Sequence, residues 1–209
     1  MVPVLDLGTH KGSASYIEKT VSLRDGRDVV IRGMRPEDVD RSWTFFKSLT
    51  DQDRKYLRVD VTDREVVARR IAEIGTGRVE RLVAVDWSQV VGDGSLQLQG
   101  HGWGDNVGEM RIIVASTMQK RGLGSLIGRE LYHLAVKHRL DRIVVRMMRP
   151  QVGARRIMEK LGFEEEYVIP NQARDQDGNL QDQIIMRCNL EEMWERMKDV
   201  FDVRTWRMH

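Results

Sequence analysis

The sequence predicts a mixed α/β domain, and three consecutive segments in the middle of the chain are the main reason. An extended segment covers residues 109–115, and a glycine-rich turn follows at 119–124. Apolar residues then recur from Leu123 to Ala135 at the spacing of an amphipathic helix. A β-branched run at 142–147 begins a second strand–helix unit. Strands and helices that alternate in this way are typical of the α/β class.

Composition limits the kinds of protein that this chain can be. Its 209 residues fit one domain with a full core, and 34 basic against 32 acidic side chains give a net charge of +2. No basic block stands out, so we expect no nucleic acid partner. One cysteine, Cys188, excludes an internal disulfide framework. With no apolar run of about 18 residues and no signal-peptide pattern, we expect no membrane partner and a cytoplasmic location.

The N-terminal half of the chain predicts a hairpin, two helices and three strands. Asp25-Gly26 lies between two alternating runs, which is a strong hairpin signal. The expected elements are a hairpin of 16–23 with 28–34, helices over 36–49 and 63–74, strands over 81–87 and 94–103 joined by a turn at 91–94, and a strand from about residue 107.

The C-terminal half predicts two further helices and two strands. Helical composition covers 154–161, and Gly162 is placed as its C-cap. An extended run opens at Phe163, and a polar loop at 175–179 precedes a strand over 182–189. Residues 190–209 carry apolar side chains on one helical face, which predicts a C-terminal helix that docks on the domain or on a second subunit.

The glycine-rich turn has the features of a phosphate site. Gly122 and Gly124 lack Cβ atoms, so a ligand can approach the backbone closely. The first turn of the following helix offers free N–H groups and the positive end of the dipole. Lys120 and Arg121 add positive charge. No G-K-[ST] follows, and a third glycine, Gly128, comes one residue too late for a dinucleotide fingerprint.

Two motifs in this order resemble the GCN5-related N-acetyltransferase (GNAT) superfamily. Gln119-x-x-Gly122-x-Gly124 matches its Q/R-x-x-G-x-G/A loop, and the helix ending Leu161-Gly162-Phe163 matches its second signature. The resemblance covers residues 28–190. It implies a central mixed, mostly antiparallel sheet flanked by helices, with an N-terminal hairpin and a C-terminal helix. We therefore divide the chain into an extension with a hairpin strand (1–27), an acyl-CoA-binding N-acetyltransferase domain (28–189), and a C-terminal helix and tail (190–209).

The resemblance also implies that acetyl-CoA is the acyl donor, with no metal. In the family the loop binds the coenzyme pyrophosphate, and a strand N–H near Val114 stabilises the thioester oxygen. Arg155 and Arg156 either reach coenzyme phosphates or are solvated surface residues. The residues expected to bind the coenzyme are Ile112, Ile113, Val114, Gln119, Lys120, Arg121, Gly122, Leu123, Gly124 and Ser125.

Three early segments narrow the resemblance to the protein-lysine acetyltransferase branch. They are residues 31–38, 46–50 and 56–58. In that branch the domain is usually fused to a larger regulatory or synthetase-like domain. We expect a stand-alone domain here, so its acceptor and control can differ from those of the branch.

Transfer to an amine needs a proton acceptor, because a lysine amine with a pKa of about 10.4 is protonated at pH 7. Glu109 begins the strand that leads to the glycine-rich turn, and the lysine acetyltransferase branch carries its base glutamate there. The alternative interpretation is a strand-end glutamate that is solvated or paired with Arg111. His101 is the next candidate base, followed by Asp105 and Glu80.

Two positions depart from the family pattern. Met158 stands where the family often has a tyrosine that protonates the leaving thiolate, and Val152 replaces a frequent asparagine. A thiolate with a pKa near ~8.5 is a tolerable leaving group without a donor. Water, Tyr132 or Tyr167 remain as proton donors, and Met158 itself is expected to pack in the core.

These features predict an enzyme that moves an acetyl or short acyl group from acetyl-CoA to a primary amine by direct attack in a ternary complex. A protein lysine is the first choice of acceptor, and a small amine or antibiotic is the second. The other hypothesis is a non-catalytic acyl-CoA-binding sensor module. A homodimer is left open.

Overall fold

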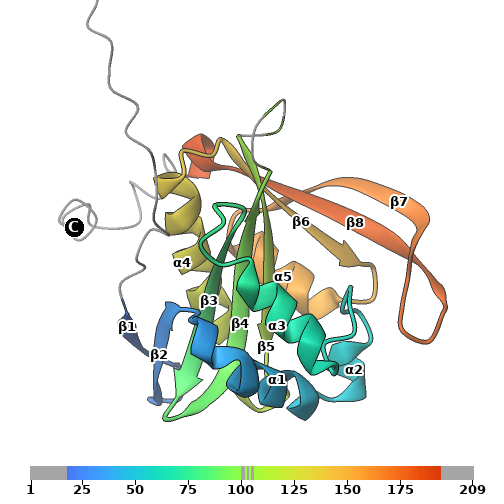
Figure 1. Cartoon of the computed structure of the whole chain (residues 1–209). Helices are drawn as coiled ribbons and strands as arrows, with labels where there is room; N and C mark the ends of the chain where they lie inside the picture. The colour runs from blue at the N-terminus through green and yellow to red at the C-terminus, as the bar shows by residue number, and fades with distance from the viewer. Residues whose placement is uncertain (1–17, 100–101, 103, 105, 194–209) are drawn as a thin grey trace, which may run out of the picture.

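The computed structural model describes residues 18–99, 102, 104 and 106–193 as one mixed α/β fold (Figure 1). The eight strands are β1 (Lys19–Ser22), β2 (Asp28–Gly33), β3 (Val79–Asp86), β4 (Gln89–Leu98), β5 (Val107–Val114), β6 (Arg142–Met148), β7 (Glu164–Arg174) and β8 (Leu180–Asn189). The helices are η1 (Pro36–Asp38), α1 (Val39–Ser48), α2 (Asp51–Arg54), α3 (Arg64–Ala72), η2 (Ser116–Met118), α4 (Leu123–Lys137) and α5 (Val152–Lys160).

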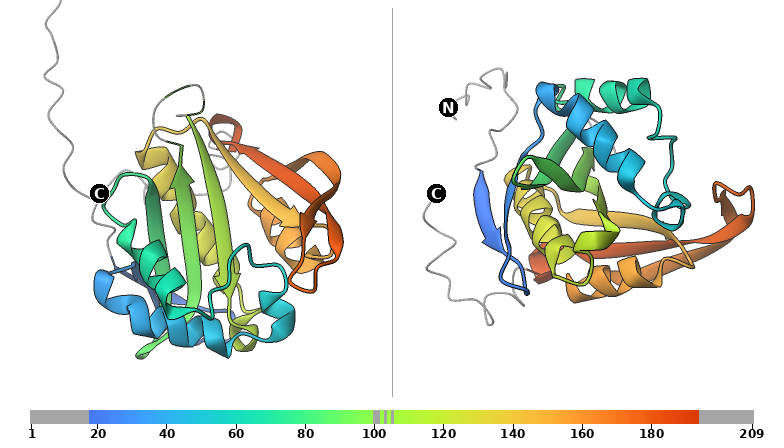
Figure 2. Two further views of the ribbon diagram at one scale, coloured as in Figure 1. Left: turned by 45° about the vertical axis from the view of Figure 1, so that its right-hand side comes forward. Right: turned by 90° about the horizontal axis from the view of Figure 1, so that it is seen from below.

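The strands form one sheet in the order β1-β2-β3-β4-β5-β6-β8-β7. Neighbouring strands are antiparallel except for β5 and β6, which are parallel and joined through α4. The predicted mixed, mostly antiparallel sheet flanked by helices is therefore confirmed. Seen from below, α1, α2 and α3 lie on one side of the sheet and α4 and α5 on the other (right panel of Figure 2).

The two sheet faces carry separate hydrophobic cores. The larger core packs α4 and α5 on the sheet, with Leu123, Ile127 and Leu131 of α4 almost completely buried. The smaller core lies under α1 and α3 and includes Phe46 and Ile71. Because successive strand side chains point to opposite faces, β3, β4 and β5 contribute to both cores.

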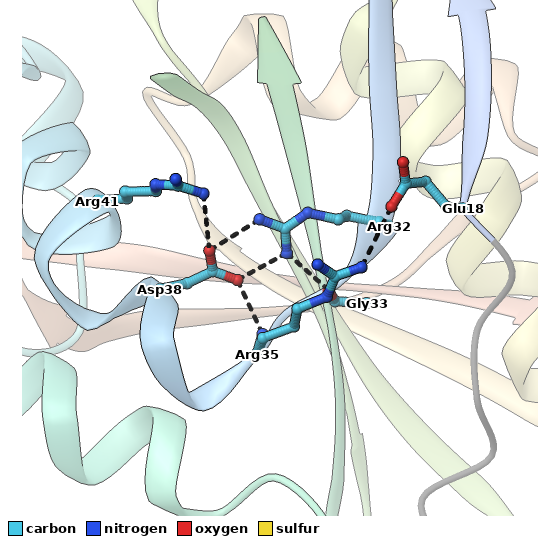
Figure 3. A network of polar contacts seen from close by, with 6 residues as sticks. All are labelled: Glu18, Arg32, Gly33, Arg35, Asp38 and Arg41. Carbon is cyan, nitrogen blue, oxygen red and sulfur yellow. Dashed lines mark hydrogen bonds and ion pairs between the residues drawn. The ribbon is translucent and has the colours of Figure 1, made fainter. Parts of the chain in front are cut away.

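A buried ion pair fixes the start of α1 on the sheet. Arg32 on β2 donates from both terminal nitrogens to the Asp38 carboxylate, at 2.7 and 2.8 Å, and the Arg35 N–H donates to the same carboxylate at 2.8 Å (Figure 3). Burial alone would raise the pKa of the Asp38 carboxyl, but these hydrogen bonds hold it below its usual value. The pair sets the direction in which the chain enters the face covered by α1.

The predicted turn at residues 91–94 is wrong, because this segment lies inside β4. The β3–β4 turn falls at Trp87 and Ser88, where Trp87 adopts a positive φ of 54°. Gly92 and Gly94 serve helix packing instead, since a Cβ on either would lie 2.8 or 2.5 Å from the Ile127 side chain of α4. The absence of side chains at these two positions lets α4 lie close to the sheet.

The strand predicted over 94–103 is shifted, because β4 covers Gln89–Leu98. The other elements predicted within the described residues are confirmed within a few residues, and α2 is an additional short helix. Gly162 follows α5 with a φ of 82°, as expected for a helix-ending glycine. The backbone is helical over 190–193, and the rest of the predicted C-terminal helix and tail lies outside the described residues, as do residues 1–17. Within the described ranges, no helix is long and apolar enough to cross a membrane.

Candidate active site

The sheet opens between β5 and β6. Their parallel pairing covers only Val107 with Arg142, Gly108 with Ile143 and Glu109 with Val144. Beyond that point β5 continues to Val114 and pairs with β4 alone, so its other edge is free of strand pairing to β6. An unpaired strand edge inside a domain offers backbone groups to a ligand.

The open edge ends next to the glycine-rich turn. The N–H of Ala115 donates to the carbonyl of Val91 on β4 at 3.0 Å. Because N–H groups alternate between the two edges of a strand, the N–H of Val114 points toward the opening. This is the direction expected of the predicted donor to a thioester oxygen.

The turn itself presents backbone donors, as predicted. Gly122 precedes α4 with a φ of 92°, a left-handed conformation that favours glycine. The first helical hydrogen bond runs from the N–H of Leu126 to the carbonyl of Gly122 at 3.1 Å, so the N–H groups of Leu123, Gly124 and Ser125 precede it. Since the Leu123 side chain is buried in the core, only its backbone is available to a ligand.

Gly124 and Gly128 allow α4 to pack closely on its neighbours. A Cβ on Gly124 would lie 3.3 Å from Ile157 of α5 and 3.8 Å from Val114. A Cβ on Gly128 would lie 2.4 Å from Leu161. The third glycine, which fits no dinucleotide pattern, is therefore explained by helix packing.

The β1–β2 turn brings additional positive charge to the glycine-rich turn. The N–H of Arg24 donates to the carbonyl of Arg121 at 3.1 Å, and the Arg24 side chain lies 3.6 Å from the place of a Cβ on Gly122. Arg121 forms an ion pair with Asp25, so part of its charge is neutralised. Arg24 was missed because about a hundred residues separate it from the turn, and no local pattern links them.

Gln119 and Lys120 complete the turn in different ways. The Gln119 amide donates to the carbonyl of Val114 at 3.2 Å and to Asp53 at 3.0 Å, so it links the end of β5 to α2. Lys120 is exposed and has a positive φ of 61°. Its charge is available at the surface of the turn.

Glu109 is buried at the last paired position of β5 and is bound by three arginines. Arg58 lies 2.7 Å from its Oε1, and Arg111 donates to the same oxygen at 3.2 and 3.3 Å. Arg146 donates to Oε2. The predicted alternative, a pair with Arg111, is thus present together with two further partners. Among the described residues, Oε2 accepts from Arg146 alone, which leaves it capacity for one more donor.

A second carboxylate lies on the same face of the sheet. Asp93 of β4 is 3% exposed, and its Oδ1 is 3.4 Å from Arg70. Among the described residues, its Oδ2 has no hydrogen-bond partner. Asp93 lies beside Ile113 in the β4–β5 register. Asp93 was not predicted as a site residue, because residues 91–94 resemble a turn in the sequence.

Among the other candidate bases, Glu80 is the one that the structure describes, and it lies away from this place. Glu80 pairs with His138 at 2.8 Å, and His138 caps the far end of α4, fifteen residues from the glycine-rich turn. His101 and Asp105 lie outside the described residues. Glu109 and Asp93 are thus the carboxylates to consider on this face.

The candidate proton donors have distinct environments. Met158 is 4% exposed in the larger core, as its packing interpretation predicted, and Val152 is exposed at the first position of α5. Tyr132 does not fit the predicted role of a proton donor to sulfur. Its hydroxyl donates to the carbonyl of Leu190, and burial raises the pKa of Tyr132 to about 12. Tyr167 is exposed on β7.

Two further features lie apart from the opening. Arg155 pairs with Glu159 and Glu165, while Arg156 is exposed. A small pocket of about 110 Å³ lies beside β7, lined by Gly162, Glu164, Glu165, Glu166, Arg187, Asn189, Glu192 and Met193. In the described part of the chain, no group of three or more His, Cys, Asp or Glu side chains is arranged to hold a metal ion.

Comparisons with known proteins agree with this arrangement. Residues 28–164 match the family model described as an acetyltransferase (GNAT) domain. No curated protein matches the chain by sequence.

Solved structures share the fold at low sequence identity. RimJ from Mycobacterium smegmatis, in complex with CoA-disulfide, aligns with a TM-score of 0.70 and 18% identity, covering 88% of this chain and 93% of that one. Ribosomal-protein-alanine N-acetyltransferase from Brucella melitensis gives 0.66 and 20%, covering 76% and 98%. A spermidine N-acetyltransferase SpeG chimera from Vibrio cholerae and hSSAT gives 0.68 and 17%, covering 80% and 99%.

Proposed function

The chain belongs to the GNAT acetyltransferase family and transfers an acetyl group from acetyl-CoA to an amine, and we propose that the amine is a lysine side chain of a protein. The catalytic unit in this proposal is residues 28–189. The observation that carries the proposal is the opening between β5 and β6, which lies between the phosphate-binding turn and the Glu109 carboxylate.

The coenzyme in this proposal binds with its pyrophosphate on the N–H groups of Leu123, Gly124 and Ser125. Arg24 and Lys120 add positive charge beside it, and the helix dipole favours the anion. The acyl arm follows the free edge of β5 along Ile112, Ile113 and Val114. This path brings the thioester carbonyl to the N–H of Val114.

The transfer step in this proposal has one proton acceptor and one hydrogen-bond donor from the chain. The neutral amine attacks the thioester carbon, its electron pair forms the C–N bond, and the carbonyl oxygen gains negative charge next to the Val114 N–H. Collapse breaks the C–S bond. Glu109 takes the amine proton, directly or through water, and water or Tyr167 protonates the thiolate.

The choice of a protein acceptor is supported by one of the structural relatives. RimJ and the ribosomal-protein-alanine enzyme are structural relatives, and the latter is named for a protein acceptor. A small amine is the second candidate, because the SpeG chimera is named for spermidine.

The test is release of free thiol from acetyl-CoA in the presence of a lysine-rich unfolded protein, spermidine, or no acceptor. Mass spectrometry then identifies the acylated nitrogen. We expect thiol release that depends on the protein acceptor, with the acetyl group on lysine Nζ. Acetylation of spermidine alone would contradict the lysine proposal. Binding of acetyl-CoA without transfer to any amine would support the sensor hypothesis instead.

A further inference from the structure

Three arginines from separate parts of the chain surround one carboxylate on the acceptor side of the sheet. Arg58 follows α2, Arg111 lies on β5 and Arg146 on β6; we refer to them as the arginine cluster. Within the described ranges, Glu109 is the only acidic side chain within 4.0 Å of any of the three. Three guanidinium groups against one carboxylate leave two positive charges uncompensated.

The arginine cluster is more exposed than the carboxylate that it surrounds. The three arginine side chains are 34–39% exposed, and the Glu109 side chain is 10% exposed. Burial lowers the pKa of the Arg58 guanidinium, and the nearby positive charges of Arg111 and Arg146 lower it further, against the opposing effect of Glu109. The excess positive charge is therefore concentrated in a place that a ligand can reach.

The arginine cluster lies on the opposite face of the sheet from α4. Met110 and Val145 point into the core under α4 and α5. Since side chains alternate along a strand, Arg111 and Arg146 point to the other face. The coenzyme site and the arginine cluster thus flank the opening between β5 and β6, and an acceptor that arrives opposite the coenzyme meets the arginines.

The β7–β8 turn contacts the segment that carries Arg58. Lys55, three residues before Arg58, pairs with Asp175 at 3.6 Å and with Asp177 at 2.5 Å. The N–H of Gln176 also donates to the carbonyl of Lys55 at 3.0 Å. These contacts connect the turn after β7 to the segment that carries Arg58.

We propose that the arginine cluster binds a carboxylate of the acceptor, so that the preferred acceptors are peptide segments with an acidic side chain next to the acetylated lysine. A guanidinium group matches a carboxylate in a bidentate geometry that an amide cannot reproduce. An acceptor carboxylate would also draw donors away from Glu109 and leave more of its oxygen lone pairs free for the amine. The proposal deepens the function proposed above and rests on it.

The test compares two peptides whose N-terminal amine is blocked, so that one lysine carries the only free amine. The residue after this lysine is aspartate in one peptide and asparagine in the other. We expect kcat/KM for thiol release to be at least about tenfold higher with the aspartate peptide. The reason is that a charge-assisted hydrogen bond to the aspartate carboxylate contributes a free energy of this size. Arg58→Gln and Arg146→Gln should each bring the ratio of the two peptides to within about twofold. Arg149→Gln, which pairs with Asp182 outside the arginine cluster, should keep the ratio.

Equal kcat/KM for the two peptides in the wild-type protein would overturn the proposal, as would a ratio that survives in both cluster variants. Acetyl-CoA affinity, measured by calorimetry in each variant, shows whether the fold and coenzyme site are intact. If neither peptide is acetylated, the affinity of each peptide for the CoA-loaded protein is measured instead. Tighter binding of the aspartate peptide would support the proposal, and equal binding would overturn it. The proposed function fails separately, by absence of thiol release with every amine.

Discussion

Glu109 and Val144 are the last residues that pair between β5 and β6, and the sheet opens directly beyond them. The carboxylate that we propose as the base therefore lies at the closed end of the opening. The glycine-rich turn lies after the other end of β5, beyond Val114. The strand between these two points sets the distance from the proposed pyrophosphate site to the proposed base.

Glu109→Gln keeps the size of the side chain and removes the proton acceptor. General acid–base catalysis contributes about 10²–10⁴-fold, so turnover should fall by roughly that factor, with acetyl-CoA affinity nearly unchanged. Steady-state thiol release and calorimetry measure the two quantities. Glu80→Gln is the matched control, because Glu80 is also an ion-paired strand glutamate but lies at the far end of α4.

Wild-type turnover in Glu109→Gln would remove Glu109 as the base. Asp93→Asn is then the next variant to measure, since Asp93 is buried on the same face with an oxygen that has no partner among the described residues. His101, the next candidate from the sequence, would be tested by His101→Gln.

Met158→Leu should leave turnover unchanged, because Met158 packs in the larger core and has no part in the proposed chemistry. The substitution conserves volume and apolar character, so the free energy of unfolding should fall by less than ~1.5 kcal/mol. Denaturant unfolding and thiol release measure both effects. A large loss of turnover without loss of stability would show that position 158 takes part in catalysis.

Asp38→Asn should strongly destabilise the fold, because it leaves Arg32 buried without its charged partner. Loss of one member of a buried ion pair costs about 3–5 kcal/mol. Asp40→Asn is the control: Asp40 and its partner Arg64 are both more than half exposed, and loss of such a pair should cost under ~1 kcal/mol. Equal losses in the two variants would contradict the role given to the buried pair.

The stabilisation of the fold by the Asp38 carboxylate should decrease as the pH falls. Its pKa in the folded protein lies below the usual value of 3.8, so the folded state keeps the carboxylate charged where the unfolded chain has begun to bind a proton. The stabilisation is thus fully present above pH 3.8 and is lost as the pH falls through the folded pKa. The stability difference between wild type and Asp38→Asn should shrink over that acidic range.

The glycine-rich turn and the strands beside it were predictable because their signals are local. Each signal depends on only a few neighbouring residues. The signals are the spacing of apolar residues, Gly122 before a helix and Gly162 after one. The β3–β4 turn was not predictable in the same way. Gly92 and Gly94 resemble turn residues, but they are required by a helix that lies more than thirty residues later in the sequence.

The charged surroundings of the site could not be predicted from the sequence. Arg58, Arg111 and Arg146 lie in different parts of the chain. The β5–β6 pairing brings Arg146 to Glu109, and the segment after α2 brings Arg58 there. Arg24 reaches the glycine-rich turn through the β1–β2 hairpin. Pairing of Glu109 with Arg111 alone could be anticipated, because the two lie two residues apart on one strand.

The most direct test of the account is calorimetric titration of acetyl-CoA into the wild-type protein, Gly124→Glu and Gly124→Gln. Both substitutions place the same bulk against Ile157, so only the negative charge of glutamate distinguishes them. With the pyrophosphate on the first turn of α4, the glutamate variant should bind at least about tenfold more weakly than the glutamine variant. Equal affinity in these two variants, with both folded, would contradict the coenzyme site on which the account depends.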